Sequence, residues 1–438
     1  MRLPRPTRIL SGILSILAGS FLGQGLIVLS TPLLTRIFDT TDFGLWAVFS
    51  AIVSILGVVA TGRLNYAIPL PGDERDASAM AWAGIAFAVG TALVIVGMGW
   101  AAGGWLTERI GAPALDGYWW LVAVTVFALG INDVYSGWLV RQRRYPALGR
   151  RNVVQGASQV GTQLGLGLAG VRPLGLLVGM AAGRLLSAAG LVVGREAVLR
   201  GPAASWRRVR AVVVRYKRFP LVASWAALIN SAGLQAPILV IAAAYGDVAA
   251  GLLGLTIRVV GAPASFLGEA VMGVFTGEAG ARVRNEDGSL AGWVRGTVLR
   301  LMGIGVIPTI VLVGFGPALF ATVFGSEWRE AGQYAQLLCL GYFAQFAVAP
   351  VSQTLLILEH QGRQLAWDTT RLLLTVGGPA VCAVAGASIT TAVLVLSLCA
   401  AACYLLLYLL CVRAAVAADR KRPSGEGLRR DSRRAPDD

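Results

Sequence analysis

Histidine, lysine and paired cysteines are nearly absent from this sequence. His360 is its one histidine, and arginines make up all but two of the 38 basic residues. The five cysteines form no Cys-x-x-Cys pair and all lie in apolar stretches, where we expect them to pack as small apolar side chains. This composition argues against a histidine-based catalytic site, and we expect neither a metal centre nor a cofactor.

Charge is scarce too: 14% of the residues are charged, whereas 56% are apolar. An apolar run of about 20 residues can cross a hydrocarbon core of ~30 Å as a helix. Backbone groups at that depth must bond within their own segment, which predicts an all-α polytopic membrane protein. Twelve spans are expected, two of them in the last run, which is broken near Gly386: Ile9–Thr35, Phe43–Gly62, Ala77–Thr107, Tyr118–Val140, Asn152–Val171, Pro173–Gly194, Phe219–Gly246, Val248–Gly277, Leu301–Ser326, Ala331–Leu358 and Leu372–Val412.

The longest charged connection, Arg195–Arg218, divides these spans into two sets of six. We therefore predict an N-terminal six-helix lobe over 1-205, a C-terminal six-helix lobe over 206-417 and a disordered cytoplasmic tail over 418-438. Because six is even, both lobes enter the membrane in the same direction, so they are related by a pseudo-twofold along the membrane normal. The first span follows a basic stretch, but it is too long for the apolar region of a signal peptide and is expected to be retained.

The arginines predict the orientation. They crowd into alternate connections, which are cytoplasmic if both termini are, and four basic residues then fall outside: Arg36, Arg109, Arg172 and Arg329. The net charge of +15 follows from this bias, so we expect no nucleic-acid partner. No long external connection is present to carry catalytic groups, so we do not expect an enzyme.

Five charged residues lie inside or at the edge of apolar spans, where charge is costly: Arg63, Arg184, Arg258, Asp133 and Glu269. Arg258, Ser265 and Glu269 are spaced to share one helical face. Two interpretations stay open. The polar groups can be interhelical contacts, with Arg184 paired to Asp133. Alternatively, they line a central cavity whose arginines hold an anion, together with the uncharged residues Gln24, Asn65, Gln159, Ser265 and Gln235.

The chain resembles the polysaccharide-biosynthesis flippases, which belong to the multidrug/oligosaccharidyl-lipid/polysaccharide exporter superfamily. The resemblance rests on several loose motifs taken together over residues 10–410: Thr31–Phe38 with Asp42–Leu45, Arg63–Pro71, Phe324–Ala331 and Ala349–Leu356. One departure is Asn65, since members often carry an acidic residue after the arginine at this place.

The resemblance implies two lobes that move an undecaprenyl-diphosphate oligosaccharide to the outer leaflet of a bacterial cell membrane by alternating access. It implies membrane lipids and a polysaccharide polymerase as partners. Arg184, Arg258 and Arg63 would hold the diphosphate, because arginine binds phosphate through forked donors. Coupling to H+ or Na+ stays open, with Glu269 and Asp133 as titrating groups. The alternatives are a cation-coupled drug or metabolite antiporter and a peptidoglycan-precursor flippase.

Overall fold

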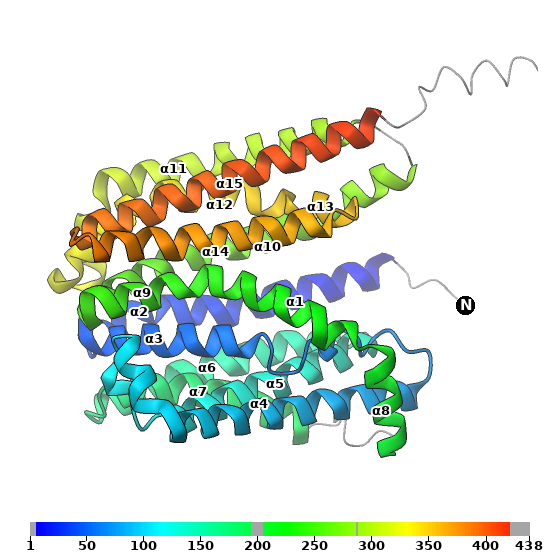
Figure 1. Cartoon of the computed structure of the whole chain (residues 1–438), viewed down its shortest axis with the longest axis horizontal. Helices are drawn as coiled ribbons and strands as arrows, with labels where there is room; N and C mark the ends of the chain where they lie inside the picture. The colour runs from blue at the N-terminus through cyan, green and yellow to red at the C-terminus, as the bar shows by residue number, and fades with distance from the viewer. Residues whose placement is uncertain (1–5, 194–204, 286–287, 421–438) are drawn as a thin grey trace, which may run out of the picture.

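The computed structural model describes residues 6–193, 205–285 and 288–420, and this part of the chain contains helices and no strand (Figure 1). The prediction of twelve membrane-crossing segments is confirmed. Residues 421–438, which make up most of the predicted disordered tail, lie outside the described residues.

The first lobe contains the first six spans. The first span continues through a short helix, α2, before the chain turns back. The lobe is formed by α1 (Pro6–Leu29), α2 (Thr31–Leu34), α3 (Thr40–Gly57), α4 (Glu74–Arg109), α5 (Trp119–Arg141), α6 (Tyr145–Leu168) and α7 (Leu174–Val193).

The second lobe contains the other six. Its helices are α9 (Ser224–Thr256), α10 (Ala262–Asn285), α11 (Leu290–Phe324), α12 (Arg329–Val348), α13 (Gln353–Ile357), α14 (Gln361–Val384) and α15 (Ile389–Arg420). Gly246 has φ 85°, outside the helical region, so α9 breaks there and carries the chain from the seventh span into the eighth. Short π-helical turns precede α9 (Phe219–Ala223) and α10 (Ile257–Gly261).

Length and hydropathy alone identify eight segments as able to cross a membrane, and one of these, Phe219–Arg284, contains both the seventh and the eighth span. The remaining spans are α1, α6 and α14. Helix α6 is rich in amides, and α14 carries Arg363, Asp368 and Arg371. These helices are accommodated because polar residues such as Gln163 and Asp368 face the interior of the protein rather than lipid.

The eleventh span, α14, begins earlier than the sequence predicts. The break near Gly386 is confirmed, since α14 ends at Val384 and α15 starts at Ile389. However, α14 begins at Gln361 rather than near Leu372, so Arg371 lies inside a helix instead of at the end of a connection. The prediction was wrong because an apolar run was required, whereas one face of α14 is polar.

A short helix between the lobes, α8 (Trp206–Arg215), packs on α4 of the first lobe (Figure 1). Arg208 forms salt bridges with Asp76 (2.9 Å) and Asp73 (3.3 Å), and Val209 and Val212 are buried. The connection is thus attached to the first lobe, and the lobe boundaries at 205 and 206 stay a prediction.

Buried apolar residues form three clusters. One contains residues of both lobes, among them Phe43, Leu252 and Trp328. The second, around Tyr135, belongs to the first lobe, and the third, around Phe275, belongs to the second. The shared cluster includes residues next to the connection after the first span, such as Phe38. This connection lies at the opposite end of the helices from the N-terminus. The lobes therefore meet at the end remote from the termini and have separate cores at the other end.

Glycines let the lobes approach closely at that remote end. A Cβ added to Gly44 of α3 would lie 2.0 Å from the carbonyl oxygen of Asp247, and one added to Gly251 of α9 would lie 2.0 Å from that of Thr40. The indole of Trp328 donates to the carbonyl oxygen of Thr35 across the same interface (3.4 Å). Backbone therefore packs directly on backbone there, which closes the molecule at this end.

Candidate functional site

A cavity of about 1360 Å³ lies where the two lobes separate. Most of its wall comes from the second lobe, from α9, α10, α12, α13, α14 and α15, while Val58 and Arg63 contribute from the first. Arg218, Leu356 and Gln361 also line it, and they sit at connections on the same side of the molecule as the termini. The cavity therefore opens toward that side.

Two cations lie at this mouth, one from each lobe. Arg63 follows Gly62 just after α3, and both residues have positive φ (58° and 55°), which turns the chain sharply at this point. The Arg63 guanidinium lies 4.3 Å from the Tyr66 ring centroid, and its Nε is buried without a partner among the described residues. Arg218 is exposed at the start of the π-helical turn before α9. Both remain able to receive an anion.

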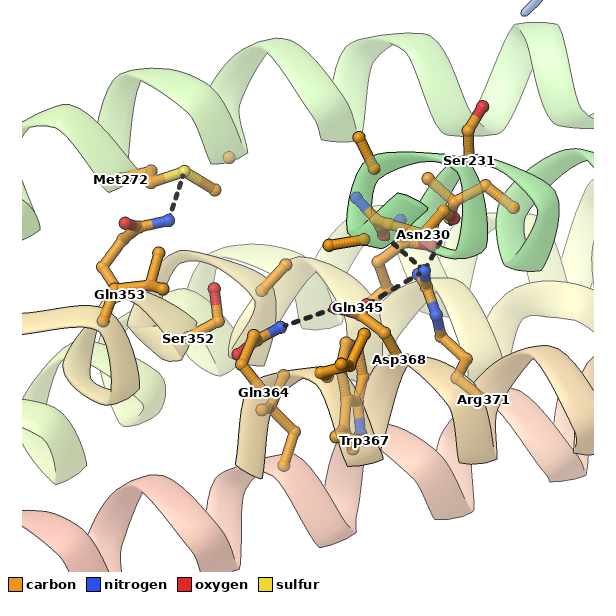
Figure 2. Close-up of a pocket in the computed structure, with 18 of the residues that line it drawn as sticks. Asn230, Ser231, Met272, Gln345, Ser352, Gln353, Gln364, Trp367, Asp368 and Arg371 are labelled. Atoms are coloured by element: carbon orange, nitrogen blue, oxygen red, sulfur yellow. Dashed lines mark hydrogen bonds and ion pairs between the residues drawn. The ribbon is translucent and has the colours of Figure 1, made fainter. Parts of the chain in front are cut away.

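Deeper in the cavity, Arg371 of α14 joins two helices (Figure 2). It is 3% exposed, and its Nη2 donates to the backbone oxygen (2.9 Å) and the side-chain oxygen (2.5 Å) of Asn230 on α9. The same nitrogen lies 3.5 Å from Asp368, and Nη1 donates to the Tyr404 hydroxyl at 3.4 Å. The charge of this arginine is thus already compensated within the protein.

Uncharged amides line the wall next to this cluster. The Gln364 amide donates to Asp368 (3.3 Å), while its Oε1 is buried with no hydrogen-bond partner among the described residues. Gln353 donates only to the Met272 sulfur (3.4 Å), a weak acceptor. Gln345 is half-buried on the same wall. Figure 2 shows these side chains on one side of the cavity, and they leave donors and acceptors unused.

The second-lobe wall also carries a carboxylate. Glu269 is exposed to the cavity and projects from the same face of α10 as Ser265 and Met272. Ser265 and Glu269 thus share a face that lines the cavity.

Arg258 does not join that face. It lies in the π-helical turn Ile257–Gly261, whose wider repeat changes the register on which the sequence pattern relied. Its guanidinium instead reaches the first lobe, donating to the backbone oxygen of Ile27 (2.8 Å) and lying 4.3 Å from the Trp46 ring centroid. Arg258 is therefore a contact between the lobes in this conformation.

Arg184 and Asp133 lie within the first lobe and outside the wall of this cavity. No salt bridge joins them among the residues that the structure describes. Nearby, Asn132 donates to the backbone oxygen of Arg184 (2.9 Å), and Arg151 donates to the Ser136 hydroxyl. A phosphate-binding role for Arg184 stays a prediction, as does coupling through Asp133.

Among the uncharged residues expected in a cavity, Ser265 lines this one and four others do not. Gln24 is exposed on α1, and Asn65 accepts a hydrogen bond from Thr61 (3.0 Å). Gln159 is buried beside α7, and Gln235 is half-buried on α9.

The sequence analysis missed the residues that dominate the second-lobe wall. Arg371 was assigned to a connection, and the amides were not considered. A detectable signal was present, because polar residues recur along one face of α14 at Gln361, Gln364, Asp368, Arg371 and Thr375. No group of three or more histidines, cysteines or carboxylates that could hold a metal ion occurs among the described residues.

Comparison with known proteins gives a consistent result. The family model described as "Polysaccharide biosynthesis protein" matches residues 33–333. No curated protein matches the chain.

Among solved structures, a lipid II flippase MurJ in an inward closed conformation is 9% identical, with a TM-score of 0.69 over 95% of this chain and 90% of that one. An inward-facing multidrug resistance MATE family transporter of the MOP superfamily is 15% identical, with a TM-score of 0.64 over 94% and 96%. A MOP superfamily transporter from Pyrococcus furiosus is 13% identical, with a TM-score of 0.56 over 94% and 96%. The chain therefore belongs to the polysaccharide biosynthesis protein family and has the fold of MOP superfamily transporters.

Proposed function

We propose that this protein is a flippase that moves a lipid-linked oligosaccharide bearing a diphosphate from the cytoplasmic to the outer leaflet of a bacterial cell membrane by alternating access. Both termini are cytoplasmic in this proposal, so the cavity faces the compartment in which such a cargo is assembled. A polysaccharide polymerase is the partner that would consume the cargo.

The observation that carries the proposal is the large cavity with two arginines at its mouth. Its volume of about 1360 Å³ exceeds the roughly 300–1,000 Å³ of ordinary small-molecule sites, which suits an oligosaccharide. Arg63 and Arg218 lie where the diphosphate would sit while the polyprenyl tail stays in the lipid. Arginine suits this task because its planar, permanently charged donors match phosphate oxygens.

The membrane potential favours this direction of transport. An inside-negative potential contributes ~2.3 kcal/mol per charge per 100 mV when an anion moves outward. Coupling to H+ or Na+ is an additional proposal, and Glu269, which lines the cavity, is the better placed of its two candidate groups.

Two alternatives share the fold. A cation antiporter needs a cavity in which carboxylates prevail, whereas Arg63, Arg218 and Arg371 face only Glu269 and Asp368 here. A peptidoglycan-precursor flippase differs in its glycan, and the likeness to MurJ favours it as the second candidate.

The test is translocation by the purified protein in liposomes. Three cargoes are compared: an undecaprenyl-diphosphate oligosaccharide with a fluorescent label, a peptidoglycan precursor on the same lipid, and a cationic dye. We expect the labelled oligosaccharide lipid to become accessible to a membrane-impermeant quencher added on the opposite side. Dye movement without movement of either lipid would establish the antiporter instead.

A further inference from the structure

The charges in the cavity are divided between its two parts. Two cations, Arg63 and Arg218, lie at the mouth. The second-lobe wall carries one carboxylate, Glu269, and the compensated pair Asp368–Arg371. The cavity is thus positive where the lobes open and neutral to negative along the wall of α10, α12 and α14.

The polar groups left free on this wall are uncharged. Gln345 and Gln353 present amides with at most a sulfur contact, and Gln364 has a buried Oε1 without a partner among the described residues. Primary amides both donate and accept, which matches the mixed character of sugar hydroxyls.

A sugar carboxylate would find no cation on this wall. Arg371 is held by Asn230, Asp368 and Tyr404, and diverting it would leave the Asp368 charge buried without its partner. Glu269 would repel a second carboxylate across the cavity, and like charges brought together in a desolvated site are strongly unfavourable.

We propose that this second-lobe wall selects the glycan of the cargo: it binds uncharged, hydroxyl-rich sugars next to the diphosphate and rejects sugars that carry a carboxylate. The selection rests on the proposed function and identifies the class of glycan. Gln345, Gln353 and Gln364 bind the hydroxyls, and Glu269 excludes acidic sugars. Asp368 and Arg371 pair with each other and so do not bind the sugar.

The experiment compares two undecaprenyl-diphosphate trisaccharides in the liposome assay, one built of neutral hexoses and one with a uronic acid in place of a single hexose. We expect the wild-type protein to move the neutral cargo roughly tenfold faster, in line with one like-charge contact. The isosteric change Glu269→Gln is expected to raise the rate for the uronate cargo relative to the rate for the neutral cargo in the same variant.

The amides are tested with Gln345→Leu and Gln353→Leu. Each substitution is expected to slow transport of the neutral cargo at least fivefold at low cargo concentration. The main effect should be a higher KM, with a smaller change in the maximal rate. Gln333→Leu is the matched control, because this residue is exposed on α12 and does not line the cavity. All variants are compared at equal amounts of folded protein, judged by a single gel-filtration peak.

Four results would overturn the inference. Equal wild-type rates for the two cargoes would show that the wall does not select, although the flippase would stand. Unchanged neutral transport in both glutamine variants, or an unchanged ratio of the uronate rate to the neutral rate in Glu269→Gln, would overturn the roles assigned to these residues. Failure of the wild-type protein to move either trisaccharide would refute both the proposed function and this selection.

Discussion

The arginines in this protein differ in the groups that contact their charged guanidinium. Arg371 is held by Asp368 and Asn230, Arg258 bonds to a backbone oxygen across the lobes, and Arg63 lies against Tyr66 with an unpaired Nε. Their sequence positions look alike, since each is a cation among apolar residues. Their surroundings assign them different tasks: internal packing, contact between lobes, and readiness for an anion.

Removing Arg371 should destabilise the protein strongly. Arg371→Ala leaves Asp368 and the Asn230 oxygens without their donor, and breaking a buried pair in this way costs about 3–5 kcal/mol. We expect a clear fall in the thermal unfolding midpoint in detergent, measured by intrinsic tryptophan fluorescence. The double variant Arg371→Met, Asp368→Leu should recover part of the loss, and an unchanged midpoint in Arg371→Ala would contradict the assigned role.

At the scale of elements, α14 supports α9 in the turn before Pro237. Pro237 has no N–H to give to the carbonyl oxygen of Gly233, one turn earlier in α9. The Thr375 hydroxyl of α14 lies 3.2 Å from that oxygen, and Arg371, one turn away on the same face, bonds to Asn230. Two side chains of α14 therefore bond to the backbone of α9 before Pro237, and the Thr375 hydroxyl shares its hydrogen with the Arg371 carbonyl oxygen of its own helix (2.8 Å).

Thr375→Val tests this support, because valine keeps the shape and removes the donor. We expect a loss of about 1–3 kcal/mol in unfolding free energy from the unsatisfied carbonyl, seen as a lower unfolding midpoint. Thr370→Val is the matched control, since its hydroxyl bonds only to Ala366 within the exposed part of α14. Equal effects of the two substitutions would argue against a role for Thr375 beside Pro237.

The contact between α3 and α9 can be tested at the same scale. Gly44→Ala would place a methyl group 2.0 Å from the Asp247 oxygen, so the lobes must separate at the closed end. We expect the distance between spin labels at Glu108→Cys and Glu327→Cys, in a background without native cysteines, to shift to longer values. Gly25→Ala, where a Cβ meets open space, should leave the distribution unchanged. If Gly44→Ala left the distance distribution between the two labels unchanged, this packing would not be what holds the lobes together.

Across the whole molecule, the sequence predicts the architecture better than the site. Length and hydropathy identify nine of the twelve spans, because lipid imposes an apolar surface directly, and the charged connection before Arg218 predicts two sets of six. The site depends on partners brought together by tertiary packing. Arg258 does not lie on its predicted face because it is part of a π-helical turn. Arg371 was missed because α14 is polar on one side and so has no continuous apolar run.

Residues, helices and lobes together form one arrangement: the lobes are closed at one end, and a cavity has two arginines at its mouth and amides along its second-lobe wall. We propose that Arg63 and Arg218 receive the diphosphate. Substituting either residue with alanine should weaken binding of the charged cargo without disturbing the core, since Arg218 is exposed and Arg63 is at the cavity surface.

The most direct measurement is the rate at which Arg63→Ala and Arg218→Ala move a labelled undecaprenyl-diphosphate oligosaccharide in liposomes, with Arg210→Ala on the exposed face of α8 as control. Losing a charge-assisted contact worth about 1.5–3 kcal/mol predicts a fall of at least tenfold in each mouth variant and none in the control. Wild-type rates in both mouth variants would contradict the account.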